Sequence, residues 1–110
     1  MIIVRFSPRA SEGIEDATRY YRRLDQKLAQ RFVAALHVAV QQIQEAPRRW
    51  AVWRDPDFRR VLVQTFPYSL IYCVVSEAEI FVAAFVHQRQ EAEAIVTRES
   101  AEAPLRSERA

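Results

Sequence analysis

The sequence predicts an α+β domain: an N-terminal strand, an antiparallel helical hairpin, a three-stranded antiparallel meander and a short C-terminal helix. Three observations predict it. An apolar stretch at residues 1–6 precedes a serine and a proline. Apolar side chains then recur at three- and four-residue steps over two segments joined by a short link. Three apolar stretches follow, separated by Pro67 and by residues 76–79. We expect the helices to cover one face of a four-stranded sheet.

Ser7 and Pro8 predict the start of the first helix. A serine side chain accepts N–H bonds at an N-cap, and proline at the first helical position lacks only an N–H that has no helical partner. Apolar residues between 10 and 24 give this helix one apolar face. Gly13, the one glycine of the chain, costs a helix about 1 kcal/mol relative to alanine. We therefore expect Gly13 to pack closely against a neighbouring element.

Asp25 predicts the N-cap of the second helix, which should end before Pro47. Its apolar stripe runs from Leu28 to Ile43, and we expect Phe32 to be buried within it. The link between the two helices is short, which predicts an antiparallel hairpin.

Residues 47–58 are predicted to be irregular, because Pro47 and Pro56 interrupt both helix and central strand. Strands are predicted at roughly 60–66, 68–75 and 80–86, and their short connections make them antiparallel neighbours. Residues 91–98 are expected to add a last helical turn or two. We therefore expect a domain at residues 1–98 and a disordered tail at 99–110.

Composition narrows the functional classes. The chain has 110 residues, a net charge of +2 and one cysteine, Cys73, which fits one domain in a reducing compartment. No apolar run approaches the length of a membrane span, and residues 1–5 are too short for the apolar region of a signal peptide. We expect a cytoplasmic protein in which Cys73, inside an apolar strand, is a buried and inert thiol.

The sequence contains no pattern of a metal or cofactor site. It has no Cys-x-x-Cys or His-x-x-x-His spacing, no glycine-rich phosphate loop and no recognisable nucleophile turn. The paired carboxylates, Asp55 with Asp57 and Glu91 with Glu93, fall in polar segments where solvated charge is the expected role. We therefore expect no cofactor and no metal.

Basic and aromatic residues remain as candidates. Fifteen of the 16 basic residues are arginine, and five of them cluster around two tryptophans. Such a cluster can stack on bases or rest on an acidic protein face; the alternative is a solvated, arginine-rich surface. The residues that we expect to bind a partner are Arg48, Arg49, Trp50, Trp53, Arg54, Arg59, Tyr68 and Tyr72.

The ends of the predicted strands carry the side chains that are capable of anion binding or proton transfer. If the strands adjoin, Arg59 or Arg60 should converge with Tyr68, Tyr72, His87 and Arg89 on the sheet face opposite the helices. Arginine can hold a phosphate or carboxylate and stabilise a developing negative charge, but it is no ordinary general base. His87 is the one plausible proton shuttle there; its structural alternative is a strand-end histidine bonded to a backbone carbonyl.

The order of these elements carries a family resemblance. It rests on Ser7-Pro8-Arg9-Ala10, Tyr20-Tyr21, the second helix up to Pro47, Arg60-Val61-Leu62, Phe66-Pro67-Tyr68-Ser69-Leu70-Ile71-Tyr72, Ala83-Ala84-Phe85-Val86-His87-Gln88-Arg89 and Arg98. Over residues 2–98 the chain resembles the RelE/ParE superfamily of type II toxin–antitoxin toxins, which includes the plasmid-stabilisation ParE proteins. The resemblance implies a toxin held by a cognate antitoxin.

Two mechanisms follow from this resemblance. RelE-like members are ribosome-dependent endoribonucleases that cut mRNA, and Arg60, His87 and Arg89 would then be catalytic. ParE-like members inhibit DNA gyrase and need no catalytic set. No tyrosine follows Tyr72, and arginines replace the lysine-rich stretch before the second strand; both departures favour the ParE-like interpretation. A third interpretation is a non-toxic relative that retains only antitoxin binding, since Ile95 and Val96 stand where many relatives carry an aromatic residue.

Overall fold

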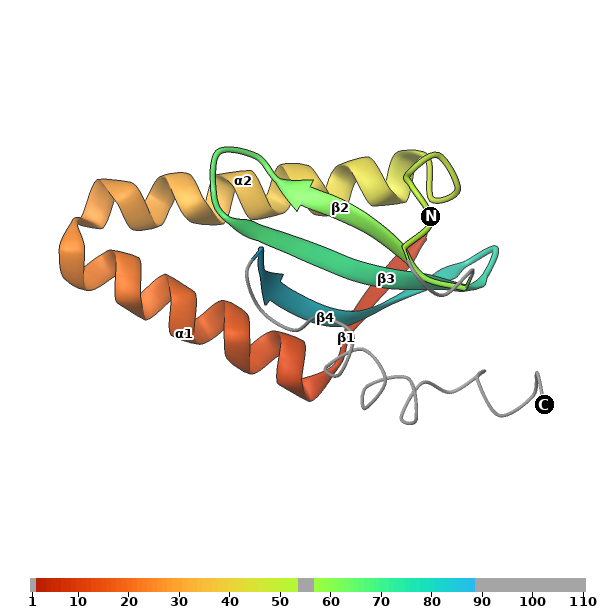
Figure 1. Ribbon diagram of the computed structural model, residues 1–110, viewed down its shortest axis with the longest axis horizontal. Coiled ribbons are helices and arrows are strands. Elements are labelled where there is room, and N and C mark those ends of the chain that lie inside the picture. Colours follow the sequence, from red (N-terminus) through yellow and green to blue (C-terminus); the bar gives the residue numbers. More distant parts are fainter. Residues whose placement is uncertain (1, 54–56, 89–110) are drawn as a thin grey trace.

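Two helices pack on one face of a four-stranded sheet in the computed structural model, which describes residues 2–53 and 57–88 (Figure 1). The elements are β1 (Ile3–Phe6), α1 (Pro8–Leu24), α2 (Gln26–Glu45), β2 (Arg59–Val63), β3 (Tyr68–Ser76) and β4 (Glu79–His87). The strand order is β1-β4-β3-β2; β1 runs parallel to β4, and the other neighbours are antiparallel. The predicted α+β architecture is confirmed. The expected helix at 91–98 and the tail at 99–110 lie outside the described residues.

Ser7 connects the start of α1 to the sheet. Its Oγ accepts the N–H of Ala10 at 3.0 Å as the helix N-cap and donates to the backbone O of Ala83 in β4 at 2.9 Å. Gly13 lies further along α1, and a Cβ atom there would stand 3.1 Å from Cδ2 of Phe85. The close packing expected of Gly13 is therefore confirmed, because a side chain there would require the Phe85 ring to shift by a few tenths of an ångström.

A single residue both ends α1 and begins α2. The backbone N–H of Asp25 donates to the O of Tyr21, and its side chain accepts the N–H of Lys27 as the α2 N-cap. This double role makes the hairpin tight, as the sequence predicts. α2 ends at Glu45, two residues before Pro47.

Both faces of the sheet are packed with apolar side chains. The helix side carries residues such as Val63, Leu70 and Val82, while Ile71 and Phe81 pack on the opposite side with Phe58. An irregularity in the β3–β4 register between Ile71 and Tyr72 adds one residue to β4, as a β-bulge does.

The second predicted strand is shorter than expected. It was predicted to reach Phe66 but ends at Val63. Thr65 takes a φ of 69° and the N–H of Phe66 donates to the O of Val63 at 3.0 Å, so the chain turns before Phe66. Phe66 then packs among aromatic rings beneath the helices.

Within residues 2–53 and 57–88, neither helix combines the length and the apolar composition that crossing a membrane requires.

Candidate protein-binding site

The chain between α2 and β2, which we call the link, is anchored to the sheet by a buried hydroxyl. Tyr72, on β3, is fully buried and donates its OH to the backbone O of Pro47 at 2.6 Å. Burial raises the pKa of the Tyr72 phenol to about 12, and nearby Arg59 acts in the opposite direction. The phenol is therefore neutral, and it remains a hydrogen-bond donor, throughout the physiological range of pH.

Two further hydrogen bonds orient Trp50. Its indole Nε1 donates to the O of Gln42 in the last turns of α2 at 3.3 Å, and its own backbone O accepts Nη1 of Arg59 at 2.7 Å. The guanidinium carbon of Arg49 lies 5.1 Å from the centre of the Trp50 ring, a cation–π distance. The aromatic ring and the arginine are thus presented together.

The following residues join the edge of the sheet. Val52 forms an antiparallel bridge with Arg59, and the N–H of Arg60 donates to the O of Ala51 at 3.1 Å. The N–H of Trp53 donates to the O of Phe58 at 2.9 Å. We call residues 48–53 the basic-aromatic segment. It has fixed backbone partners even though it contains no regular secondary structure.

Exposure separates the residues of this segment that face solvent from those that support it. Arg48 and Arg49 are exposed, Trp50 and Trp53 are half-buried, and Arg59 is half-buried beneath the segment. The structure therefore brings together five of the residues predicted to bind a partner. Arg54, predicted with them, lies outside the described residues.

Tyr72 and Tyr68 do not join that surface. Tyr72 exposes none of its area, so the structure corrects the expectation that it contacts a partner: it supports the segment from inside. Tyr68 stacks on Phe85 at 4.5 Å between ring centres and packs edge-on against Phe32. It belongs to an aromatic cluster under the helices.

The aromatic cluster also contains a second phenol with a raised pKa. Tyr21 on α1 packs against Phe32 and Phe66, with ring centres 5.2 Å apart in both pairs. Burial raises the pKa of Tyr21 to about 12, and the neighbouring Tyr68 acts in the same direction. His87 closes this end of the sheet, edge-on to Tyr68 at 5.4 Å.

The expected convergence of the strand-end groups opposite the helices is not formed. Arg60 donates Nε to Oγ of Ser69 at 3.0 Å on the sheet face away from the helices, whereas His87 pairs with Tyr68 on the helix side. Along β3 their partners are Ile71 and Tyr68, which places the two groups about 10 Å apart along the strands. The prediction failed because side chains alternate between faces and Arg60 sits at the far end of its strand. Arg89 lies outside the described residues.

Sequence reasoning missed two residues that orient this site. Ser69 is fully buried and fixes Arg60; its only signal is a small polar residue within an apolar strand. Gln42 supplies the backbone O that accepts the Trp50 indole N–H, and a backbone acceptor has no signature in the side-chain pattern. Among the described residues, no three His, Cys, Asp or Glu side chains are grouped so as to hold a metal ion.

Comparison with known proteins gives this site its context. The family described as "ParE toxin of type II toxin-antitoxin system, parDE" matches residues 4–92. The chain belongs to the ParE toxin family. Among solved structures, a chain of "Chromosomal ParDE TA system from P. aeruginosa" superposes with a TM-score of 0.68 at 17% identity, covering 79% of this chain and 96% of that one. No curated protein matches the chain. In this ParE family member, the match runs from the second residue of β1 through the end of β4.

Proposed function

We propose that this ParE family member inhibits growth through DNA gyrase, in the cytoplasm, and is neutralised by a cognate antitoxin. The observation that carries the proposal is the separation of Arg60 from His87 on opposite faces of the sheet. A general acid–base mechanism needs its groups within reach of one reacting centre. Binding without chemistry needs only a fixed surface.

The basic-aromatic segment supplies such a surface. Tryptophan and arginine are the residue types that most often dominate binding energy at protein interfaces, and Arg49 and Trp50 are presented side by side. The surrounding arginines favour a partner face that is negatively charged and speed its association. We therefore assign gyrase binding to residues 48–53.

Purified gyrase and relaxed plasmid test the proposal. The wild-type chain should inhibit supercoiling or trap cleaved DNA. A double variant, Arg48→Ala with Arg49→Ala, should need about tenfold more protein or more for the same inhibition. The matched control is Arg22→Ala with Arg23→Ala, which removes two exposed arginines from the last turn of α1. Equal loss in both double variants would indicate a general charge effect, and an inactive, folded wild-type chain would refute the gyrase target.

The RelE-like alternative is an endoribonuclease acting on mRNA at the ribosome, with Arg60, His87 and Arg89 as its catalytic groups. Mapping mRNA 5′ ends after expression of the chain separates the two functions. Cuts at fixed codon positions that disappear in folded His87→Ala and Arg89→Ala proteins would establish cleavage and replace the gyrase proposal.

The third alternative is a non-toxic relative that retains only antitoxin binding. Pulse labelling of DNA and protein synthesis after induction of the chain alone distinguishes all three. An early fall in DNA synthesis supports gyrase, and an early fall in protein synthesis supports mRNA cleavage. Normal growth with soluble, folded protein supports the non-toxic relative.

A further inference from the structure

A hollow of about 400 Å³ lies between α2, the link and β2. Its walls carry one cation, two amides and one indole above an apolar floor; in that order these are Arg60, Gln42 with Gln64, Trp50, and Val61 with Leu62. No aspartate or glutamate stands among the described residues that line it, so the hollow suits an anion. Its volume falls within the range of about 300–1,000 Å³ that small-molecule sites occupy. We call it the Trp50 hollow.

The cation of the Trp50 hollow is fixed in direction. Ser69 is fully buried in β3, and its Oγ accepts Nε of Arg60 at 3.0 Å. An arginine in solvent needs no such support, and burying a hydroxyl is costly unless it is hydrogen-bonded. Among residues 2–53 and 57–88, Arg60 has no ion pair. Its two Nη groups therefore remain available to a phosphate, which a guanidinium can hold with two parallel hydrogen bonds.

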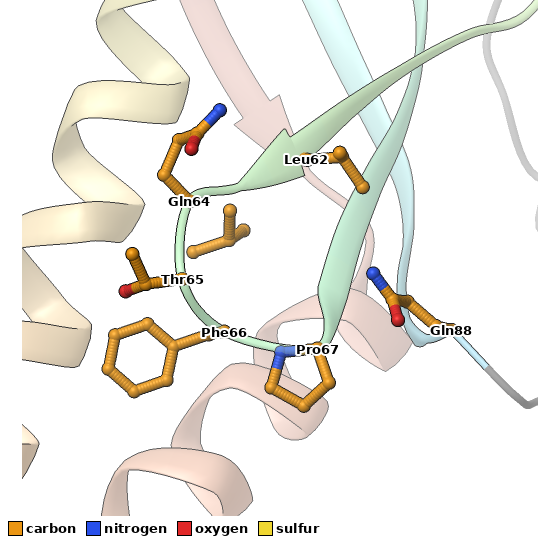
Figure 2. A pocket seen from close by; sticks show the side chains of 7 residues that line it. Leu62, Gln64, Thr65, Phe66, Pro67 and Gln88 are labelled. Carbon is orange, nitrogen blue, oxygen red and sulfur yellow. The ribbon is translucent and has the colours of Figure 1, made fainter.

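The indole and the amides suit a planar ring with polar edges. Trp50 is held in place because its Nε1 donates to the O of Gln42 at 3.3 Å, and the guanidinium carbon of Arg49 lies 5.1 Å from its ring centre. A nucleobase can stack on an indole or on a guanidinium. Gln64 extends its side chain along the α2 side of the β2–β3 turn (Figure 2), and an amide that both donates and accepts can pair with a base edge.

A neighbouring hollow shows which features matter. It measures about 360 Å³, follows the β2–β3 turn as far as Gln88, and shares Leu62 and Gln64 with the Trp50 hollow (Figure 2). The described residues that line it include no cation and no tryptophan. An amide and an apolar side chain occur in both hollows, whereas a fixed guanidinium paired with an indole occurs only in the first of them. That pairing selects the ligand.

We propose that the Trp50 hollow binds a nucleotide, with its base against Trp50 and Gln64 and its phosphate on Arg60. Inorganic phosphate would use Arg60 alone, and an uncharged aromatic ring would leave Arg60 without a partner; a nucleotide uses both. No bond is broken, so the site is independent of mRNA cleavage, and it goes beyond the proposed inhibition of gyrase. Two sources carry this chemistry: a free nucleotide and one nucleotide of a single DNA strand.

The test titrates the full chain, labelled with ¹⁵N, with deoxyadenosine monophosphate up to millimolar concentration. The indole N–H signal of Trp50 and the side-chain amide signals of Gln64 should shift, while the indole signal of Trp53, which does not line the hollow, should stay in place. Deoxyadenosine, which lacks the phosphate, should bind about tenfold more weakly. The variant Arg60→Gln should remove this difference. Its control Arg31→Gln, at an exposed position of α2, should preserve it.

A second variant reports on the base. Gln64→Ala, at an exposed position, should weaken the binding of deoxyadenosine and of its monophosphate by the same factor, about threefold, and keep the difference between them. A tetranucleotide of deoxyadenosine then separates the two sources. Binding about tenfold tighter than that of the monophosphate would assign the hollow to a DNA strand, and equal affinity would assign it to a free nucleotide.

The proposal would be overturned by equal binding of deoxyadenosine and its monophosphate to the wild-type chain. It would also be overturned if inorganic phosphate shifted the Trp50 indole signal equally, or if that signal did not move at millimolar nucleotide. The titration contains no gyrase, so a folded chain that is inactive in the supercoiling assay would refute the gyrase target and leave this proposal standing.

Discussion

The start and the middle of β3 are held in different ways; we call the region around Tyr68 the aromatic end and the region around Tyr72 the link end. Around Tyr68, four rings from both helices, the β2–β3 turn and β4 form a cluster with it, in which neighbouring ring centres are 4.5–6.1 Å apart. Around Tyr72, the link is held by individual hydrogen bonds: one hydroxyl on Pro47, one indole N–H on Gln42 and one guanidinium on the O of Trp50. The first region is held by the large contact area between rings, and the second is held by a few directional hydrogen bonds.

This difference predicts that one region determines the stability of the domain and the other determines the orientation of residues 48–53. Each buried ring makes many weak contacts, so a change at the aromatic end should affect the free energy of unfolding of the whole domain. A hydrogen bond contributes about 1 kcal/mol net but fixes an orientation. A change at the link end should therefore affect how residues 48–53 meet a partner while leaving most of the stability intact.

The largest expected effect is at Phe32, the fully buried ring at the centre of the aromatic end. Phe32→Ala removes its contacts with Tyr21, Phe66, Tyr68 and Phe85 and should destabilise the domain by about 3–5 kcal/mol. Urea denaturation measures the loss. The control Val33→Ala, at a residue that is 38% exposed on the same helix, should cost much less. Similar losses in both variants would mean that the aromatic end is not the main source of stability.

Alkaline pH should weaken both ends in one window. The folded-state pKa values of Tyr21 and Tyr72 are raised from 10.0 to about 12, because burial favours the neutral phenol. Their contribution to stability is therefore complete below pH 10 and is lost as the pH rises through 12. Melting temperatures measured across this window, together with phenolate absorbance, check the prediction; a melting temperature unchanged up to pH 12 would contradict it.

The sequence predicted the aromatic end better than the link end, for a physical reason. Caps at Ser7 and Asp25, the buried Phe32 and the close approach at Gly13 follow from local rules of helix ends, periodicity and glycine chemistry. The position of Arg60 relative to His87 depends on sheet register and on which face each side chain occupies, and a shift of one residue reverses the face.

The link end depends on partners that a side-chain pattern cannot reveal. Tyr72 reads as a candidate surface residue until its hydroxyl is found on the O of Pro47, 25 residues away in sequence. Three of the acceptors that hold the link are backbone carbonyls, at Gln42, Pro47 and Trp50. Every residue has a carbonyl, so the sequence does not indicate which ones are used.

A substitution at Gly13 tests whether the aromatic end can accommodate an added side chain. A Cβ there would meet Phe85 at 3.1 Å, and Phe85 is stacked on Tyr68. Gly13→Val adds further atoms to this contact and should destabilise the domain by about 1–3 kcal/mol, despite the low helix propensity of glycine. Thermal denaturation measures the change, with Ser11→Val at an exposed position of the same helix as the control for valine in a helix. Equal destabilisation at both positions would show that α1 can move away from β4.

The smallest expected change in stability is at the link end, where the functional change should be largest. Tyr72→Phe keeps the buried ring and removes its hydrogen bond to Pro47, for a cost of about 1 kcal/mol. Amide hydrogen exchange at residues 48–53 should become faster, and gyrase inhibition should fall. The control Ile80→Val, at a fully buried position of β4, should lower the free energy of unfolding by a similar amount, about 0.5–1.5 kcal/mol. It should leave gyrase inhibition unchanged. If the two variants inhibit gyrase equally, the orientation of the link has no part in binding, and the contrast between the two ends concerns stability alone.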